Sequence, residues 1–219
     1  MHRCRNLMYA GAFTALGALG ATGLGFVMAQ PEGGEMPSPE EMQEMMEKMY
    51  AAMTPGEGHE KLDYFVGEWN TTMRIYMGGP GSPPVESTGT SSIEWILDGR
   101  FLREHMKSEI MMPDPETGAM APMSYEGIGT QGYDNYKNLY VSSWVDSMNT
   151  HLLTMRGAAD PSGKVFTYYG EMDEPSLDVG GRMVKYKVTI QGDDRFIFEM
   201  TDLHAGENYK VMETVYERQ

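Results

Sequence analysis

From Glu68 onward, apolar and polar residues alternate in short segments that are separated by turn residues. An alternation with a period of two predicts β-strands with one buried and one solvent-facing side. The predicted strands are Glu68–Met77, Val85–Leu97, Arg100–Met112, Met123–Tyr133, Asn138–Asp146, Thr150–Ala158, Lys164–Met172, Arg182–Gln191, Arg195–Leu203 and Asn208–Arg218. A meander of about ten strands removes its free edges by closing. We therefore expect an all-β fold, a closed antiparallel up-and-down barrel preceded by helices.

Short and long connections alternate between these strands. The short turns are Leu97–Arg100, Asp134–Lys137, Asp160–Gly163 and Gly192–Asp194, and the long loops are Gly78–Pro84, Pro113–Pro122 and Asp173–Gly181. The dipeptide Asp98-Gly99 predicts a type I′ hairpin. Because alternate connections of a meander lie at the same end, the pattern predicts a tightly turned base and a loop-rich mouth.

The first 29 residues have the composition of a secretory signal peptide. Basic residues precede an apolar run from Leu7 to Ala29, which ends in a cleavage motif, Val27-Met28-Ala29. The alternative is an uncleaved membrane anchor. We expect cleavage, export to the periplasm or the extracellular space, and no stable membrane insertion afterwards. The only cysteine, Cys4, lies in this leader, so the mature chain forms no internal disulfide.

Residues 30–57 form an acidic, Met-rich helix and linker. Ser38 and Glu41 predict a helix start with a capping box. The methionines at helical spacing are Met42, Met45, Met46, Met49 and Met53. Thioethers of this kind could bind Cu(I), but we favour a surface that packs on the barrel or on a protein partner through residues 36–53, or stays partly disordered. A second short helix is predicted from His59 to Val66, inside the barrel domain of residues 58–219.

The charge of the chain excludes one class of partner. Without the leader it has 15 basic and 32 acidic side chains, a net charge of −17. A surface this negative repels phosphate backbones, so nucleic acid is not expected as a partner.

Several motifs resemble known families. Gly67-Glu68-Trp69 after a short helix resembles the start of the lipocalin and calycin superfamily, in which an Arg of the last strand packs across the Trp; this resemblance makes Trp69 and Arg218 a structural pair at the base. Residues 59–218 are similar to DUF1579, a bacterial family of unknown function. The stretches that carry this resemblance are Gly67-Glu68-Trp69, Leu97-Asp98-Gly99-Arg100-Phe101-Leu102, Gly129-Thr130-Gln131-Gly132-Tyr133-Asp134, Trp144-Val145-Asp146-Ser147 and Glu213-Thr214-Val215-Tyr216-Glu217-Arg218. The resemblance implies a lipocalin-like barrel and brings no catalytic residues.

If Trp69 points inward, as the resemblance implies, alternation defines the inner face of most strands. The orientation of the fourth to seventh strands stays open, because Tyr140 and Trp144 on one face compete with Val141 and Val145 on the other. The residues that we expect to contact a ligand are Trp95, Glu104, Met112, Met123, Trp144, Tyr186 and Phe198. Methionines near the mouth offer adaptable apolar contacts; they are Met77, Met111, Met112, Met120, Met123, Met148 and Met172.

Glu104 is a charged residue at an inward position. An unpaired carboxylate there would be costly or would stay protonated. It is either a polar anchor for a ligand or a satisfied buried group, paired with Arg218 or with Tyr hydroxyls. Asp146 has the same two interpretations; as a satisfied group it would cap a strand end at the mouth.

Motifs of known enzymes are absent from the sequence: it has no Gly-x-Ser-x-Gly, no His-Glu-x-x-His and no phosphate loop. A His-ligated haem would need an inward His, for which His151 is the candidate, but a lone His is more often structural or exposed. We expect no cofactor and no metal site.

Three functions are compatible with this pattern. The leading hypothesis is an exported barrel that binds a small apolar or amphipathic molecule. The second is an enzyme that acts on an apolar substrate with Glu104 or Asp146 as general acid or base. The third is an interaction module that docks through the Met-rich helix and has a barrel filled by its own side chains.

Overall fold

The structure is a computed structural model that describes residues 37–114 and 116–219. The predicted signal peptide, residues 1–29, lies outside the described residues. Within the described part of the chain, no helix is both long and apolar enough to cross a membrane.

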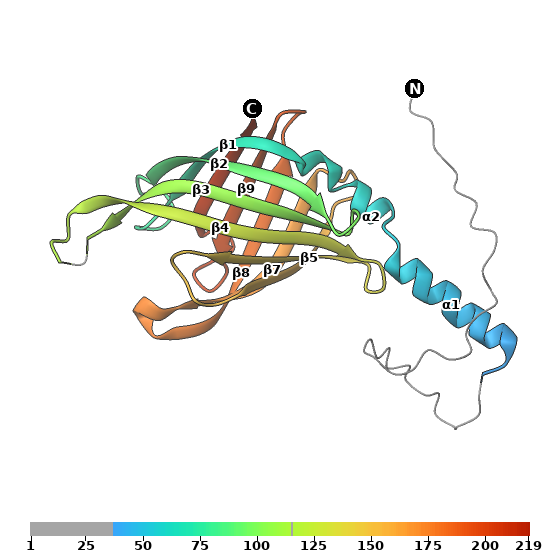
Figure 1. The fold of residues 1–219 in the computed structure, drawn as a ribbon. Helices are drawn as coiled ribbons and strands as arrows, with labels where there is room; N and C mark the ends of the chain where they lie inside the picture. Colours follow the sequence, from blue (N-terminus) through green and yellow to red (C-terminus); the bar gives the residue numbers. More distant parts are fainter. Residues whose placement is uncertain (1–36, 115) are drawn as a thin grey trace, which may run out of the picture. The chain divides into compact units, whose positions relative to one another are not determined.

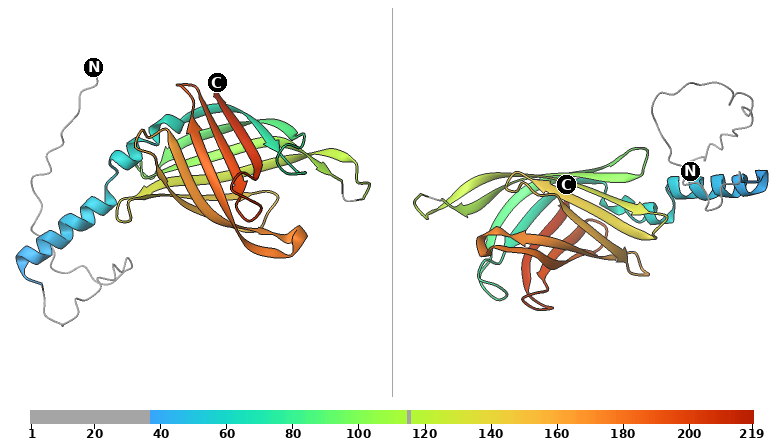
Figure 2. Two further views of the ribbon diagram at one scale, coloured as in Figure 1. Left: turned by 180° about the vertical axis from the view of Figure 1, so that it is seen from behind. Right: turned by 90° about the horizontal axis from the view of Figure 1, so that it is seen from below.

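Ten antiparallel strands close into a barrel (Figures 1 and 2), which confirms the predicted fold class. The strands are β1 (Gly67–Ile75), β2 (Val85–Ile96), β3 (Phe101–Pro113), β4 (Met120–Asp134), β5 (Leu139–Asp146), β6 (Leu153–Ala159), β7 (Val165–Glu174), β8 (Val179–Ile190), β9 (Arg195–Asp202) and β10 (Lys210–Arg218). Each strand pairs with its neighbours in sequence, and β1 pairs with β10 to close the barrel, with Trp69 opposite Arg218.

Two hairpins at the mouth are longer than predicted. β4 begins at Met120 rather than Met123, and its pairing with β3 extends to Pro113. β8 begins at Val179 rather than Arg182, after a 3-10 turn, η2 (Pro175–Leu177). Because the pairing of β3 with β4 continues to Pro113, the β3–β4 hairpin extends beyond the neighbouring strands (Figure 1).

At the base, the turn between β2 and β3 has three successive residues with positive φ. These are Leu97 at 52°, Asp98 at 55° and Gly99 at 78°. Left-handed backbone at Asp98 and Gly99 is what the Asp-Gly signal predicts, because Asp and Gly tolerate it. Leu97 joins them while its side chain is largely exposed.

Helix α1 (Pro39–Met53) begins as predicted. The Glu41 carboxylate accepts hydrogen bonds from the backbone N–H and the hydroxyl of Ser38, both at 2.8 Å, and the hydroxyl of Ser38 accepts one from the N–H of Glu41 at 3.3 Å. None of the residues of α1 is buried. A partner for its Met stripe therefore stays a prediction.

The second helix was predicted as one segment, His59–Val66, and this is wrong. The structure has helix α2 (Glu57–Glu60) and a separate 3-10 turn, η1 (Asp63–Phe65). The break lets two apolar side chains enter the base of the barrel: Leu62 is fully buried and Phe65 is 3% exposed. Their burial removes apolar surface from water and closes this end.

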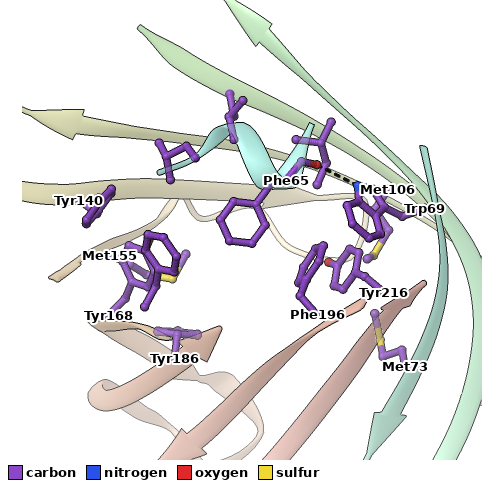
Figure 3. Close-up of a cluster of buried hydrophobic side chains, with 14 of the residues drawn as sticks. Phe65, Trp69, Met73, Met106, Tyr140, Met155, Tyr168, Tyr186, Phe196 and Tyr216 are labelled. Carbon is purple, nitrogen blue, oxygen red and sulfur yellow. Dashed lines mark hydrogen bonds between the residues drawn. The ribbon is translucent and has the colours of Figure 1, made fainter. Parts of the chain in front are cut away.

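The strands keep the predicted alternation. Trp69, Thr71 and Met73 on β1 are buried. On β5, whose orientation the sequence left open, Tyr140 is 3% exposed whereas Val145 is 42% exposed, so Tyr140 and Trp144 form the inner face. Figure 3 shows the resulting cluster of buried aromatic and Met side chains. Within it, the ring of Phe196 stacks on that of Tyr216 with 4.1 Å between the centroids.

Candidate ligand-binding cavity

The interior of the barrel is not filled by its own side chains. It encloses a cavity of about 550 Å³ whose lining is mostly apolar. Phe65 and Phe196 line it at the base, and Met148, His151 and Pro175 line it at the mouth. The volume falls within the range of small-molecule sites, roughly 300–1,000 Å³.

Glu104 lines this cavity near the base. Its Oε1 atom accepts hydrogen bonds from the hydroxyl of Ser91 at 2.8 Å and from the hydroxyl of Tyr216 at 2.9 Å. Strand pairing explains the cluster, because β2 and β3 are neighbours and Tyr216 faces them from β10. Burial raises the pKa of the Glu104 carboxyl above its ordinary value, and the two hydrogen bonds only partly oppose this rise.

Two further polar pairs line the same cavity. The side-chain amide of Gln131 on β4 donates to the hydroxyl of Tyr168 on β7. The indole N–H of Trp144 on β5 donates to the hydroxyl of Tyr125 on β4 at 3.1 Å. Each pair joins two strands across or along the wall, so these polar groups are held in fixed positions.

A glycine makes room for Trp144. A Cβ atom on Gly127 would lie 2.1 Å from Cζ2 of the indole, far inside contact distance. Gly129 is directly opposite Trp144 in the ladder between β4 and β5. The glycines of β4 therefore let the indole lie flat against the wall of the cavity.

The structure places five of the seven predicted ligand contacts in the lining. They are Glu104, Met112, Trp144, Tyr186 and Phe198. Trp95 does not line the cavity: its indole N–H donates to Asp63 at 2.8 Å, beside the η1 turn at the base. Met123 does not line it either: the pairing of β4 with β5 ends at Gly127, so β4 has no neighbour on that side at Met123, which is 39% exposed.

Only some of the methionines predicted at the mouth line the cavity. Met112, Met148 and Met172 line the cavity. The other predicted rim residues, Met77, Met111, Met120 and Met123, are outside the lining. Five methionines that were not assigned to the mouth also line the cavity; they are Met73, Met106, Met155, Met200 and Met212.

Asp146 takes the capping role that was one of its two interpretations. It lines the cavity at the end of β5, and its Oδ1 accepts hydrogen bonds from the backbone N–H groups of Met148 and Asn149 at 2.9 and 3.0 Å. These bonds fix the turn that carries His151. His151, the candidate for an inward His, also lines the cavity at its mouth.

The lining carries one sign of formal charge. Its carboxyl groups belong to Glu104, Asp146, Asp173 and Glu174, and none of the described residues that line it is Lys or Arg. Arg218, a predicted partner of Glu104, lies at the base instead and is not in the lining. Within residues 37–114 and 116–219, His, Asp and Glu side chains form no group of three that could hold a metal ion.

Sequence reasoning missed the residues that hold Glu104 and the polar wall. Ser91, Gln131 and Tyr168 were not named as site residues, although all lie on inward positions of their strands. Tyr hydroxyls were named as partners for Glu104, but Tyr216 was not singled out among them. The alternation of β2 and β10 places Ser91 and Tyr216 on the inner face, but their meeting with Glu104 depends on the register of three strands.

The chain matches one family model and resembles solved structures. The family model "Protein of unknown function (DUF1579)" matches residues 54–218. The solved structure of Rv2717c from M. tuberculosis is similar in fold, with a TM-score of 0.51 and 12% identity over 76% of this chain and 99% of that one. A redesigned β-barrel matches with a TM-score of 0.33 and 15% identity, over 74% of this chain and 95% of the design. The search of curated proteins found none that matches.

Proposed function

Since the chain belongs to the DUF1579 family, whose function is unknown, we propose a function from the cavity itself: the protein binds a small apolar or amphipathic molecule inside its barrel. The observation that carries this proposal is a cavity of about 550 Å³ that is mostly apolar and contains a few fixed polar groups. This combination is typical of sites that bind a molecule through its apolar body and orient it by a few hydrogen bonds.

The same cavity weakens the competing hypotheses. An interaction module would have been supported by a barrel filled with its own side chains, and this barrel is not filled. For an enzyme, Glu104 is the candidate acid or base, but its hydrogen bonds come from the hydroxyls of Ser91 and Tyr216, and no described His, Lys or Arg contacts it to exchange its proton. Asp146 is engaged in its own turn. Binding without chemistry therefore accounts for more of the lining.

Met side chains support loose shape selectivity. Eight methionines line the cavity, and flexible thioethers can repack around ligands of different shape. Trp144, Tyr186 and Phe198 supply flat surfaces between them. A ligand with a linear or ring-shaped apolar body would remove both kinds of surface from water, which is the main source of affinity here.

Titration with an environment-sensitive apolar dye tests the proposal. The protein should bind one dye molecule per chain and saturate, and fatty esters, isoprenoid alcohols or aromatic compounds should displace it. If the folded protein bound no member of such a panel, the proposed function would be wrong.

We also propose that the mature protein acts outside the cytoplasm, as the leader-like composition of residues 1–29 suggests. Sequencing the N-terminus of the native protein tests this. A start at or near Gln30 supports export, and intact residues 1–29 in the membrane fraction would indicate an anchor.

A further inference from the structure

One oxygen of the Glu104 carboxyl is left open to the cavity. Both hydroxyl donors bind Oε1, and none of the hydrogen bonds among the described residues reaches Oε2. Within the described part of the chain, the side-chain polar atoms that are fully buried and have no hydrogen-bond partner are the hydroxyls of Tyr186 and Thr189. Oε2 of Glu104 also has no partner among the described residues but is not one of these atoms, so it is not fully buried. Because Glu104 lines the cavity, Oε2 is exposed to the cavity.

This arrangement fixes where a proton on the carboxyl would be. Oε1 already accepts two hydrogen bonds, so a proton on Oε1 would take one of its acceptor positions and displace at least one of the two donors. The proton of the neutral acid therefore belongs on Oε2, where it points toward the cavity. Burial favours this neutral form, since it raises the pKa of Glu104.

The groups that face Glu104 do not provide a positive charge. Tyr216 on β10 and Tyr125 on β4 are the titratable groups near it, and burial raises the pKa of each hydroxyl, with the charge of Glu104 adding to the rise. Both hydroxyls therefore stay neutral. None of the described lining residues is Lys or Arg. His151, the basic side chain of the described lining, lies at the mouth, whereas Glu104 lies near the base, and the carboxyl groups of Asp146, Asp173 and Glu174 share the same cavity.

We propose that the barrel selects uncharged amphipathic molecules whose carbonyl, ester or ether oxygen accepts a hydrogen bond from Oε2 of Glu104, and that it rejects carboxylates of the same chain length. This inference rests on the proposed binding function and specifies the chemical class of its ligand. A ligand carboxylate would lose its hydration without gaining a counterion, whereas an ester oxygen needs only the one donor that Glu104 presents.

Three molecules with the same apolar chain separate the possibilities. Methyl decanoate, decanoate and decylamine are each used to displace the bound dye at neutral pH. The expected result is that methyl decanoate binds about tenfold or more tightly than decanoate, which corresponds to one well-placed hydrogen bond and the desolvation of one charge. Equal affinity for the ester and decanoate, or tightest binding of decylamine, would overturn the inference.

Two substitutions assign the effect to Glu104. In Glu104→Gln, the amide oxygen can accept from Ser91 and Tyr216 while the amide N–H₂ donates to the cavity, so the preference for the ester should remain. In Glu104→Leu, the donor is lost and affinity for methyl decanoate should fall about tenfold, toward the affinity for a hydrocarbon of similar size. Unchanged ester affinity in a folded Glu104→Leu protein would contradict the inference.

A pH titration keeps the inference testable if Glu104→Leu does not fold. Ester binding to the unsubstituted protein should weaken as pH rises and Glu104 ionises, and the Glu104→Gln variant should show no such loss. Equal pH profiles for the two proteins would overturn the inference. If neither the dye nor any of the three molecules binds the folded protein, the binding function itself fails and this inference fails with it. If the dye binds but the ester does not displace it, or if ester and decanoate bind equally, the inference alone fails.

Discussion

The guanidinium carbon of Arg218 lies 4.2 Å from the centre of the indole ring of Trp69. The same guanidinium donates to the backbone oxygens of Val66 and Tyr64, both at 2.9 Å. Arg218 therefore joins the last strand to the first strand and to the segment that closes the base. Gly67 has a φ of 142°, and a Cβ atom there would lie 2.5 Å from Nη1 of Arg218, so glycine leaves space for this contact.

Replacing Arg218 should loosen the closure of the barrel. Arg218→Ala removes the cation–π contact and two hydrogen bonds, and we expect a loss of about 1–3 kcal/mol in the free energy of unfolding, measured by urea denaturation. Arg218→Lys is the control, because it keeps the charge but not the fork that reaches both carbonyl oxygens. If Arg218→Lys loses as much stability as Arg218→Ala, the two hydrogen bonds of the guanidinium are what stabilises the closure. If neither variant loses stability, the role assigned to Arg218 is contradicted.

Crowding Trp144 should deform the wall of the cavity. Gly127→Ala places a methyl group against the indole, which must move, and we expect a loss of about 1–3 kcal/mol in stability together with weaker dye binding. Gly192→Ala is a contrasting variant, because no atom lies within 4 Å of its Cβ position, although its φ of 82° adds backbone strain. It should affect stability but not dye affinity. Unchanged near-ultraviolet circular dichroism and dye affinity in Gly127→Ala would contradict the arrangement.

The stability of the protein should decrease as pH rises because of Glu104. The pKa of Glu104 is higher in the folded state than its ordinary value of 4.5. The folded state therefore retains a proton that the unfolded state loses, and the stabilisation is complete below the ordinary pKa and is lost as pH rises through the folded pKa. The difference in the free energy of unfolding between the original protein and Glu104→Gln should thus shrink or reverse from about pH 4.5 upward. A difference that does not change with pH would show that Glu104 has an ordinary pKa.

The barrel should fold without helix α1. A deletion of residues 1–54 removes α1, and since none of the residues of α1 is buried, the loss of this helix exposes little apolar surface. The hydrogen bonds that this deletion removes from the barrel domain include those from Asn135 to the carbonyls of Ala51 and Thr54. Thermal denaturation should give nearly the same midpoint as the full chain. Removing residues 1–66 is the contrasting deletion, because it also takes away Leu62 and Phe65 and should abolish the cooperative transition. A large loss in the shorter deletion would show that α1 belongs to the core.

The sequence was sufficient for the fold because strand alternation is a local property. On β1, β3 and β10, alternation predicts each inward residue from the inward residue two positions earlier. The number of consecutive strands then predicts a closed sheet. On β5 both faces are apolar, so alternation alone could not choose between Trp144 and Val145. The choice depends on the glycines of β4, which accept the indole of Trp144 and would leave a gap beside a smaller side chain.

The site was predictable only in part, because it depends on how far each strand extends and on register. Met112 and Met123 both end predicted strands near the mouth, but β4 continues beyond Gly127, where its pairing with β5 ends, and this leaves Met123 exposed outside the cavity. Trp95 is inward on β2 but close enough to the base to bond Asp63. The link from Glu104 to Tyr216 joins residues 112 positions apart, and the chain pattern contains no local trace of it.

Met112 and Met123 now serve as a matched pair. Met112→Lys places a charge in the lining and should weaken binding of the apolar dye about tenfold or more, because the ammonium group must be buried or must displace the ligand. Met123→Lys places the same charge on an exposed part of β4 and should leave binding unchanged. Fluorescence titration measures both. If both substitutions weaken dye binding equally, the dye binds at the rim and not inside the cavity.

The most direct test of binding inside the barrel is the nuclear magnetic resonance spectrum of methionine methyl groups, because Met residues line the cavity and also cover the outside. In protein labelled at these methyl groups, a saturating apolar ligand should shift the signals of Met73, Met106, Met112 and Met212, which line the cavity, and leave those of Met45, Met77, Met123 and Met183, which are exposed and outside it, in place. Shifts confined to the exposed group, with the lining group unchanged, would contradict the account.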